Sequence, residues 1–177
     1  MRIRDATVSD AQKISEVHID TWKTAYRGII PQDYLDNLSY KERKERWTNI
    51  LTNLEAIKSN KSFTLVAEVE DERIVGFASG GKERSQDPVY SGELYGIYIL
   101  QDWQKKGIGT VLVKETVRRL INGGFDSMLV WVLADNPSRL FYESLGGKPI
   151  RTQLIKIGGA DLKEVAYGWQ RVSEILE

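Results

Sequence analysis

At Gln104-Lys105-Lys106-Gly107-Ile108-Gly109-Thr110 the chain passes from a strand pattern into a helix pattern. The residues before this loop, Glu93 to Leu100, are apolar on both faces, which is typical of a central strand. The residues after it, Gly107 to Ile121, repeat apolar side chains at helical spacing and end at Gly123-Gly124. A strand followed by a helix and a further strand predicts a right-handed crossover between parallel strands.

The glycines of this loop allow a sharp turn and leave backbone N–H groups bare at the start of a helix, which suits a phosphate or diphosphate. Lys105 and Lys106 add positive charge. A dinucleotide-binding fingerprint fits poorly because its third glycine would fall at Leu112, and a P-loop fits worse because no Gly-Lys-Ser/Thr follows the required spacing. The residues alone leave open whether the loop binds a phosphate or only begins a helix.

The other elements follow from periodicity and capping residues. One helix is expected from an N-cap at Ser9 to near Gly28, a charged one from the capping box Ser39/Glu42 through Leu54, and a short one after Asn136. Strands are expected at 3–6, 63–69, 74–78, 93–100, 128–133, 150–157 and 162–170. The order β-α-α-β-β-β-α-β-α-β-β predicts an α/β fold of the mixed α+β kind. We expect a single domain over 1–177, with a mostly antiparallel sheet and helices on both faces.

Composition excludes several classes of protein. The 177 residues carry 25 Lys+Arg and 25 Asp+Glu, and this balance argues against a nucleic-acid partner held by a general basic field. The chain has no Cys and one His, so thiol nucleophiles and metal sites rich in Cys or His are excluded and no metal is expected. With no apolar run near the ~20 residues of a membrane span and no signal peptide at Met1, we expect a cytoplasmic protein with no membrane partner.

A second motif follows the strand at 128–133. The stretch Asn136-Pro137-Ser138-Arg139-Leu140-Phe141-Tyr142-Glu143-Ser144-Leu145-Gly146 ends in Phe-Tyr-Glu-x-Leu-Gly, and the glycine loop supplies Gln-x-x-Gly-x-Gly at Gln104, Gly107 and Gly109. Both motifs, in this order and at this separation, resemble those of the GNAT superfamily of N-acetyltransferases. The order of elements also agrees with that family over nearly the whole chain.

The resemblance implies acetyl-CoA as cosubstrate. Its diphosphate would lie against the loop, chiefly on backbone N–H groups, and its pantetheine arm would pair with the backbone of the preceding strand, which usually bulges. Tyr142 matches the tyrosine that protonates the departing thiolate. Asn136 either contacts the pantetheine arm or only caps the helix, and Asp135 is the alternative at that place. The cofactor-binding residues so implied are Ile97, Tyr98, Ile99, Gln104, Lys105, Lys106, Gly107, Ile108, Gly109, Thr110, Asn136 and Tyr142.

The acceptor is less determined by the sequence. An alkylamine has a pKa near ~10, so a base must help at neutral pH. By family analogy the best-placed carboxylate is Glu93, and an ordered water is the alternative. The resemblance places the acceptor beside the first two helices. Candidates there are Trp22, Tyr26, Arg27, Ile29 and Ile30, and His18 is expected to be a packed residue on the border of that pocket.

Three functions stay open at this point. The first is an acetyl-CoA-dependent N-acetyltransferase that moves the acetyl group directly to a primary amine of a small molecule or a peptide N-terminus. The second is a non-catalytic CoA-binding sensor with the same fold. The third is a structural or nucleotide-binding domain whose loop holds another phosphate. A homodimer is possible through the edge of the strand-rich C-terminus.

Overall fold

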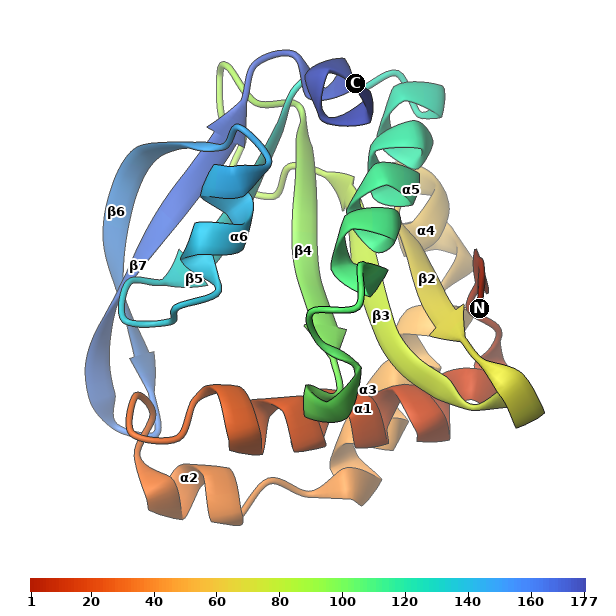
Figure 1. The fold of residues 1–177 in the computed structure, drawn as a ribbon, viewed down its shortest axis with the longest axis vertical. Coiled ribbons are helices and arrows are strands. Elements are labelled where there is room, and N and C mark those ends of the chain that lie inside the picture. The colour runs from red at the N-terminus through yellow and green to blue at the C-terminus, as the bar shows by residue number, and fades with distance from the viewer.

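The computed structural model describes residues 1–177 and contains one seven-stranded sheet between two layers of helices (Figure 1). The strands are β1 (Arg2–Asp5), β2 (Phe63–Glu68), β3 (Ile74–Lys82), β4 (Gly92–Ile99), β5 (Met128–Leu133), β6 (Lys148–Ile157) and β7 (Ala160–Trp169). The helices are α1 (Ala11–Ala25), α2 (Gln32–Asp36), α3 (Tyr40–Thr52), α4 (Leu54–Asn60), α5 (Ile108–Asn122) and α6 (Arg139–Ser144).

The strand order in the sheet is β1-β2-β3-β4-β5-β7-β6. Every neighbouring pair is antiparallel except β4 and β5, which are parallel and are connected through α5. The predicted α+β fold, the mostly antiparallel sheet and the central place of β4 are therefore confirmed. The tight turn between β6 and β7 is made by Gly158 and Gly159, both with positive φ, as a type I′ hairpin turn requires.

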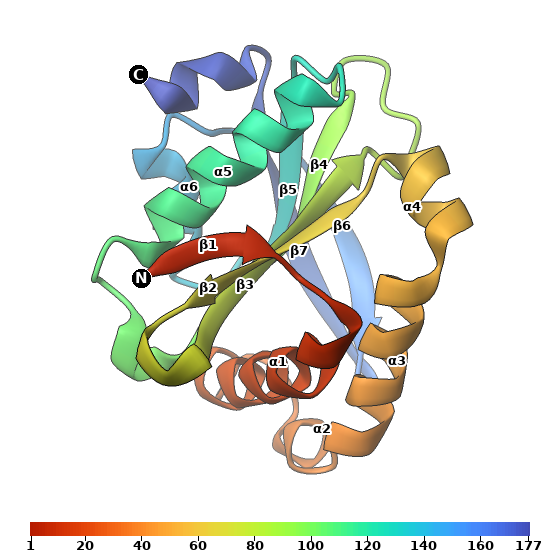
Figure 2. The ribbon, with the colours of Figure 1, turned by 90° about the vertical axis from the view of Figure 1, so that its right-hand side faces the viewer.

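The two helical layers bury different parts of the sheet. In Figure 2, α5 and α6 lie on one face, while α1, α2 and α3 lie on the other. The α5 side holds the larger core, in which Leu112 and Val117 of the helix meet Leu94 of β4. The smaller core packs Ile14 of α1 and Trp47 of α3 against Phe77 of β3. A central strand that helices cover on both faces has apolar side chains on both faces, so its sequence is a continuous apolar run. For this reason β4 and β5 were recognisable in the sequence.

Two expected helix boundaries are wrong. Ser9 is not the N-cap of the first helix, because a 3-10 turn over Val8–Asp10 begins at Thr7, whose N–H donates to the Asp10 carboxylate at 2.8 Å. The charged helix stops before Leu54, because the Asn53 side chain accepts the N–H of Ala56 at 3.0 Å and begins α4 as a separate helix. The cap at Ser39 is confirmed, with its hydroxyl accepting the N–H of Glu42 at 3.2 Å.

The sheet opens between β4 and β5, and this opening positions the site. The two strands pair only at Gly92 with Met128 and at Glu93 with Leu129. Immediately afterwards β4 bulges at Tyr95, since Leu94 faces Gly80 while Gly96 faces the adjacent Ser79. From the bulge to Ile99, β4 has no strand partner on the β5 side, while β5 continues to pair with β7.

None of the helices is both long and apolar enough to cross a membrane.

Candidate active site

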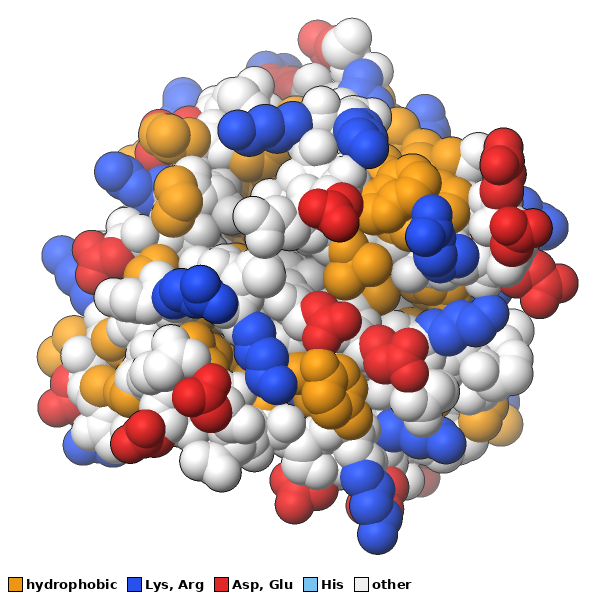
Figure 3. All heavy atoms as spheres, turned by 60° about the horizontal axis from the view of Figure 1, so that its bottom comes forward, with side chains coloured by type: hydrophobic (Ala, Val, Ile, Leu, Met, Phe, Trp, Pro, Cys, Tyr) orange, Lys and Arg blue, Asp and Glu red, His pale blue; other side chains and the backbone are white.

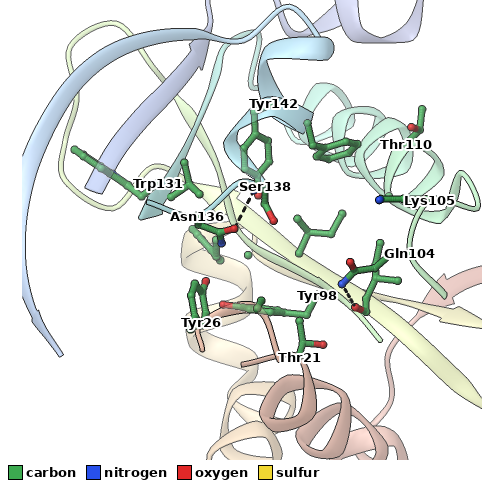
Figure 4. A pocket seen from close by; sticks show the side chains of 18 of the residues that line it. Thr21, Tyr26, Tyr98, Gln104, Lys105, Thr110, Trp131, Asn136, Ser138 and Tyr142 are labelled. Carbon is green, nitrogen blue, oxygen red and sulfur yellow. Dashed lines mark hydrogen bonds between the residues drawn. The ribbon is translucent and has the colours of Figure 1, made fainter. Parts of the chain in front are cut away.

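A cleft of about 400 Å³ occupies the opening between β4 and β5 (Figure 4). It is bounded by the end of β4, the glycine loop, the start of α6 and one face of α1. Its walls contain Thr21, Ala25, Tyr26, Tyr95, Gly96, Ile97, Tyr98, Ile99, Gln104, Lys105, Gly107, Gly109, Thr110, Trp131, Val132, Asn136, Ser138, Phe141 and Tyr142. Most of the expected cofactor-binding residues therefore meet in one place, although they come from three separate parts of the chain.

The glycine loop presents a row of unpaired backbone donors to this cleft. None of the six N–H groups from Lys105 to Thr110 donates a hydrogen bond to another group of the protein. The backbone is left-handed at Lys105, with φ of 58°, and at Gly107, with φ of 82°, so successive N–H groups converge on one concave surface before α5 begins. This geometry, with the positive end of the α5 dipole behind it, fits a bound diphosphate.

Gly109 is the glycine whose missing side chain matters most for space. A Cβ built there would lie 3.2 Å from Cζ of Phe141 and 3.4 Å from Cδ1 of Ile99, so a larger side chain would fill the mouth of the cleft. The loop is also tied to the strand, because the Gln104 side-chain N–H donates to the carbonyl of Ile99 at 3.0 Å. Loop and strand end therefore form one rigid wall.

Two of the expected cofactor residues do not line the cleft. The ammonium of Lys106 lies 4.9 Å from the centroid of the Trp103 ring, where a cation–π contact holds it. The side chain of Ile108 is buried in the larger core. Only the backbone N–H groups of these two residues belong to the site.

Tyr142 extends from α6 toward the cleft, with its side chain almost fully buried (Figure 4). Its ring packs beside Phe141, at 5.5 Å between ring centroids, and its hydroxyl has no hydrogen-bond partner in the protein. Burial, together with nearby Tyr98, raises the pKa of Tyr142 above its ordinary value. The phenol is therefore protonated at neutral pH and suited to donating a proton.

Asn136 is not the cap of the short helix, because α6 begins at Arg139 with Ser138 as its N-cap. The Asn136 side-chain oxygen accepts the N–H of Ser138 at 2.9 Å and so organises the turn before α6, and the same buried side chain lines the cleft opposite Tyr26. Asp135 is exposed and does not line the cleft.

A second hollow, of about 460 Å³, continues from the cleft toward α1, α2 and β6. Tyr26, Tyr95, Tyr98, Trp131 and Val132 line both spaces, so the two form one passage through the sheet.

The expected acceptor residues divide into two groups. Trp22, Tyr26 and Ile30 line the second hollow. Arg27 is exposed in the turn after α1 and lines neither space, and Ile29 packs beside the small cluster that contains Leu35.

Glu93 lies in the wall of the second hollow and is 2% exposed. Its carboxylate accepts three hydrogen bonds from Arg84, one from the backbone N–H at 3.2 Å and two from the guanidinium at 3.0 Å and 2.5 Å. The carboxylate is thus at the expected place, in an ion pair that the sequence did not reveal.

His18 is the packed residue that the sequence indicated. Its ring stacks on Tyr98 at 4.4 Å between centroids, and its Nδ1 accepts the indole N–H of Trp47 at 3.1 Å. Burial, with Arg43 and Arg46 nearby, lowers the pKa of His18 to about 3, so the ring is neutral under physiological conditions.

Sequence reasoning missed several lining residues. Thr21 and Ala25 stand four residues apart on one face of α1, and that spacing could have grouped them with Tyr26 at the end of the same helix. The other missed residues are Tyr95 and Tyr98 of β4, Arg84 in the connection from β3 to β4, and Trp131 of β5. Their places in the walls depend on the bulge and on the opening of the sheet. No local pattern marks those features.

The sheet, the loop of bare N–H groups and the buried tyrosine together form the site of an α+β protein that can take a ligand with a diphosphate. The family described as "Acetyltransferase (GNAT) family" matches residues 21–147, and the chain belongs to this family of N-acetyltransferases.

Among similar proteins, the "Uncharacterized N-acetyltransferase YuaI" of Bacillus subtilis is 39% identical over 98% of this chain and 95% of its own length. The "Spermidine N(1)-acetyltransferase" of Thermoplasma acidophilum is 23% identical over 77% of this chain and 80% of its own length.

The same fold occurs in solved structures. The PaiA N-acetyltransferase of Thermoplasma acidophilum, in complex with coenzyme A, matches with a TM-score of 0.67 and 20% identity over 93% of this chain and 96% of that one. YncA from Salmonella typhimurium, with acetyl-CoA, matches with a TM-score of 0.69 and 21% identity over 96% of this chain and 92% of that one.

Proposed function

We propose that this N-acetyltransferase uses acetyl-CoA and transfers the acetyl group directly to a primary amine of a small molecule or a peptide N-terminus. The observation that carries the proposal is the cleft that runs from the six unpaired N–H groups of the glycine loop to the unpaired hydroxyl of Tyr142. Two relatives of the same fold hold coenzyme A or acetyl-CoA. Together these observations favour a CoA thioester as the ligand of the cleft.

The residues present fit each part of that cosubstrate. The N–H groups from Lys105 to Thr110 would hold the diphosphate, with the Lys105 ammonium beside it. The β4 backbone over Ile97, Tyr98 and Ile99 has no strand partner toward β5, and an extended amide chain such as the pantetheine arm would pair there as an added strand. The absence of Cys removes a covalent acyl-thiol route through the protein, which favours direct transfer.

When bound, acetyl-CoA would supply an acetyl group activated as a thioester. The amine nitrogen forms a bond to the acetyl carbon, the carbon–sulfur bond breaks, and the amine loses a proton. We assign that proton to Glu93, directly or through one water, and we assign to Tyr142 the proton that the departing sulfur takes up. Positioning of the two reactants in the continuous passage supplies a further large share of the rate.

Turnover measured against a panel of amines tests this function. The panel contains polyamines, amino acids, aminoglycosides and peptide N-termini, and mass spectrometry detects an acetylated product. In parallel, thermal unfolding is compared with acetyl-CoA, CoA, NAD and ATP, because a ligand that binds only the folded state raises the melting temperature. We expect stabilisation by acetyl-CoA and CoA alone, and acetylation of at least one amine class.

The outcomes separate the rival functions. Stabilisation by CoA without acetylation of any amine would identify a CoA-binding sensor instead. Stabilisation by NAD or ATP but not by CoA would show that the loop holds another phosphate.

A further inference from the structure

Arg43 is a half-buried arginine without a hydrogen-bond acceptor in the protein. Two other arginines are buried to a similar degree, and both bind carboxylates: Arg4 pairs with Asp10 and Glu68, and Arg119 pairs with Asp5 and Glu115. Arg43 forms no ion pair and no hydrogen bond with any group of the protein. A guanidinium removed from water without a compensating acceptor is unfavourable, so an acceptor from outside the chain is expected.

Arg46 stands three residues further along α3 and is likewise free of ion pairs. The spacing of three residues puts the two side chains on one side of α3, and both line the same groove. Burial, and after it the charge of Arg46, lowers the pKa of Arg43. The Arg43 guanidinium is held in place from one side, 5.8 Å from the centroid of the Trp22 ring. Two adjacent cations without an anion between them form a site that a single carboxylate or phosphate would complete.

These arginines line a groove of about 620 Å³ that also contains His18, Trp47 and Tyr98. The groove adjoins the acceptor side of the active site, because Arg84, Tyr95 and Tyr98 line both the groove and the second hollow.

Gly96 lines both the groove and the cleft. A small molecule with its amine beside Tyr98 could therefore extend an acidic group toward α3.

The carboxylates of the acceptor side all have hydrogen-bond donors within the protein, so none of them pairs with Arg43 or Arg46. Glu93 is bound by Arg84, Glu83 accepts the N–H groups of Ser85 and Asp87 at 2.9 Å and 2.8 Å, and Glu164 accepts the side-chain amide of Gln153. Of these three carboxylates only Glu93 is paired with a cation, while Glu83 and Glu164 are held by neutral donors and keep their negative charge in the acceptor hollow.

The pair of free arginines, Arg43 and Arg46, is a local feature of the groove. On the face that carries α1 and α2, acidic and basic side chains are interspersed and form no broad basic surface (Figure 3).

We propose that the acceptor carries an anionic group, a carboxylate or a phosphate, which Arg43 binds together with Arg46 while the amine faces Tyr98 and Tyr142. The inference rests on the proposed function and narrows its substrate class to amino-acid-like or phosphorylated amines. A simple diamine or polyamine lacks the group that these arginines would recognise.

The test uses pairs of amines that differ in the anionic group. Glycine with glycinamide forms the carboxylate pair, and phosphoethanolamine with ethanolamine forms the phosphate pair. For each pair the ratio of kcat/KM is measured in the parent, in Arg43→Gln and in Arg43→Glu, so that differences in intrinsic amine reactivity cancel. Lys44→Gln is the matched control, because Lys44 is an exposed cation of the same helix outside the groove.

We expect the ratio to favour the anionic member in the parent, to fall by about 10–100-fold in Arg43→Gln, mainly through KM, and to fall further in Arg43→Glu. Lys44→Gln should leave it unchanged. If the ratio falls for glycine with glycinamide, the recognised group is a carboxylate. If it falls for phosphoethanolamine with ethanolamine, the recognised group is a phosphate. An unchanged ratio in both Arg43 variants, or a parent that prefers spermidine to every anionic amine, would overturn the inference.

Calorimetric binding of the same four amines, with CoA present, separates this inference from the proposed function. Binding of an anionic member that is lost in Arg43→Gln, without any acetylation, would support the anion site and contradict the transferase mechanism. If none of the four amines is either acetylated or bound, the inference is wrong.

Discussion

The Glu93 carboxylate and the Arg84 guanidinium form a two-point ion pair in the wall of the acceptor hollow, with Nη2–Oε1 at 2.5 Å and Nε–Oε2 at 3.0 Å. The side chain of Glu93 is buried, whereas that of Arg84 is 63% exposed and stacks over the Tyr95 ring at 4.5 Å. The pair fixes the carboxylate at the point where the passage crosses the sheet.

Replacing Glu93 by Gln should lower turnover most near and below neutral pH, with little change in acetyl-CoA affinity. Glutamine keeps the shape and still accepts from Arg84, but it cannot take the proton of the amine. Loss of a general base typically costs about 10²–10⁴-fold, which sets the expected scale. The measurement is a pH–rate profile of kcat/KM.

The matched control is Glu164→Gln, which removes a second carboxylate from the same hollow without touching Arg84. A Glu93→Gln profile that coincides with the parental one would remove Glu93 from the mechanism, and an ordered water that passes the proton to backbone carbonyls would replace it.

Replacing Gly109 by Asp should nearly abolish acetyl-CoA binding in a folded protein. The new side chain would begin 3.2 Å from the Phe141 ring and carry negative charge into the space that the bare N–H groups surround. Isothermal calorimetry measures the affinity, and circular dichroism checks the fold. Gly109→Ala has the same Cβ without the charge, so it should bind more weakly than the parent and more tightly than Gly109→Asp. Parental affinity in a folded Gly109→Asp variant would contradict the diphosphate assignment.

The sequence predicted the parts of the fold that depend on short-range patterns. The strand–loop–helix unit from β4 to α5 was readable because a doubly covered strand, a glycine turn and an amphipathic helix each leave a local signal. The break between α3 and α4 was missed because Asn53 caps the second helix without a glycine or proline to mark the boundary. Asparagine also occurs inside charged helices, so the sequence alone does not distinguish a capping asparagine from one within a helix.

The acceptor side could not be predicted in the same way. The ion pair joins Arg84, in the connection between β3 and β4, to Glu93 at the start of β4, and its place in the hollow depends on the bulge at Tyr95. The approach of Arg43 to Tyr98 depends on how α3 packs against α1. Both are consequences of pairing and packing between segments distant in sequence, so periodicity carries no information about them.

Replacing Asp10 by Asn should destabilise the protein at neutral pH. Hydrogen bonds from Arg4, at 2.7 Å and 2.9 Å, lower the pKa of Asp10 from 3.8 to about 2. Since the pKa is depressed in the folded state, this stabilisation is present above pH 3.8 and is lost as the pH falls toward 2. The shift corresponds to about 2 kcal/mol of unfolding free energy at pH 7.

Urea unfolding of the parent and Asp10→Asn at pH 7 and near pH 3 measures this difference, which should shrink at the lower pH. Asp5→Asn is the control, because Asp5 pairs with Arg119 at an exposed position where an ion pair contributes about 0–1 kcal/mol. Equal losses for both variants at pH 7 would contradict the special role of the Arg4–Asp10 pair.

Replacing Tyr142 by Phe should leave acetyl-CoA affinity nearly unchanged and slow the chemical step. The ring would still pack beside Phe141, and the lost hydroxyl has no partner in the protein, so folding should be unaffected. The proton donor acts as the sulfur departs, so the loss should appear in kcat rather than KM, on a scale of about 10²–10⁴-fold. Because slow product release would hide part of the defect, single-turnover measurement is the decisive form of the experiment.

Tyr167→Phe is the matched control, since its hydroxyl donates to Glu143 at 2.7 Å outside the cleft. If Tyr142→Phe has the parental single-turnover rate, the Tyr142 side chain serves only for packing. Another group would then have to donate the proton to the departing thiolate.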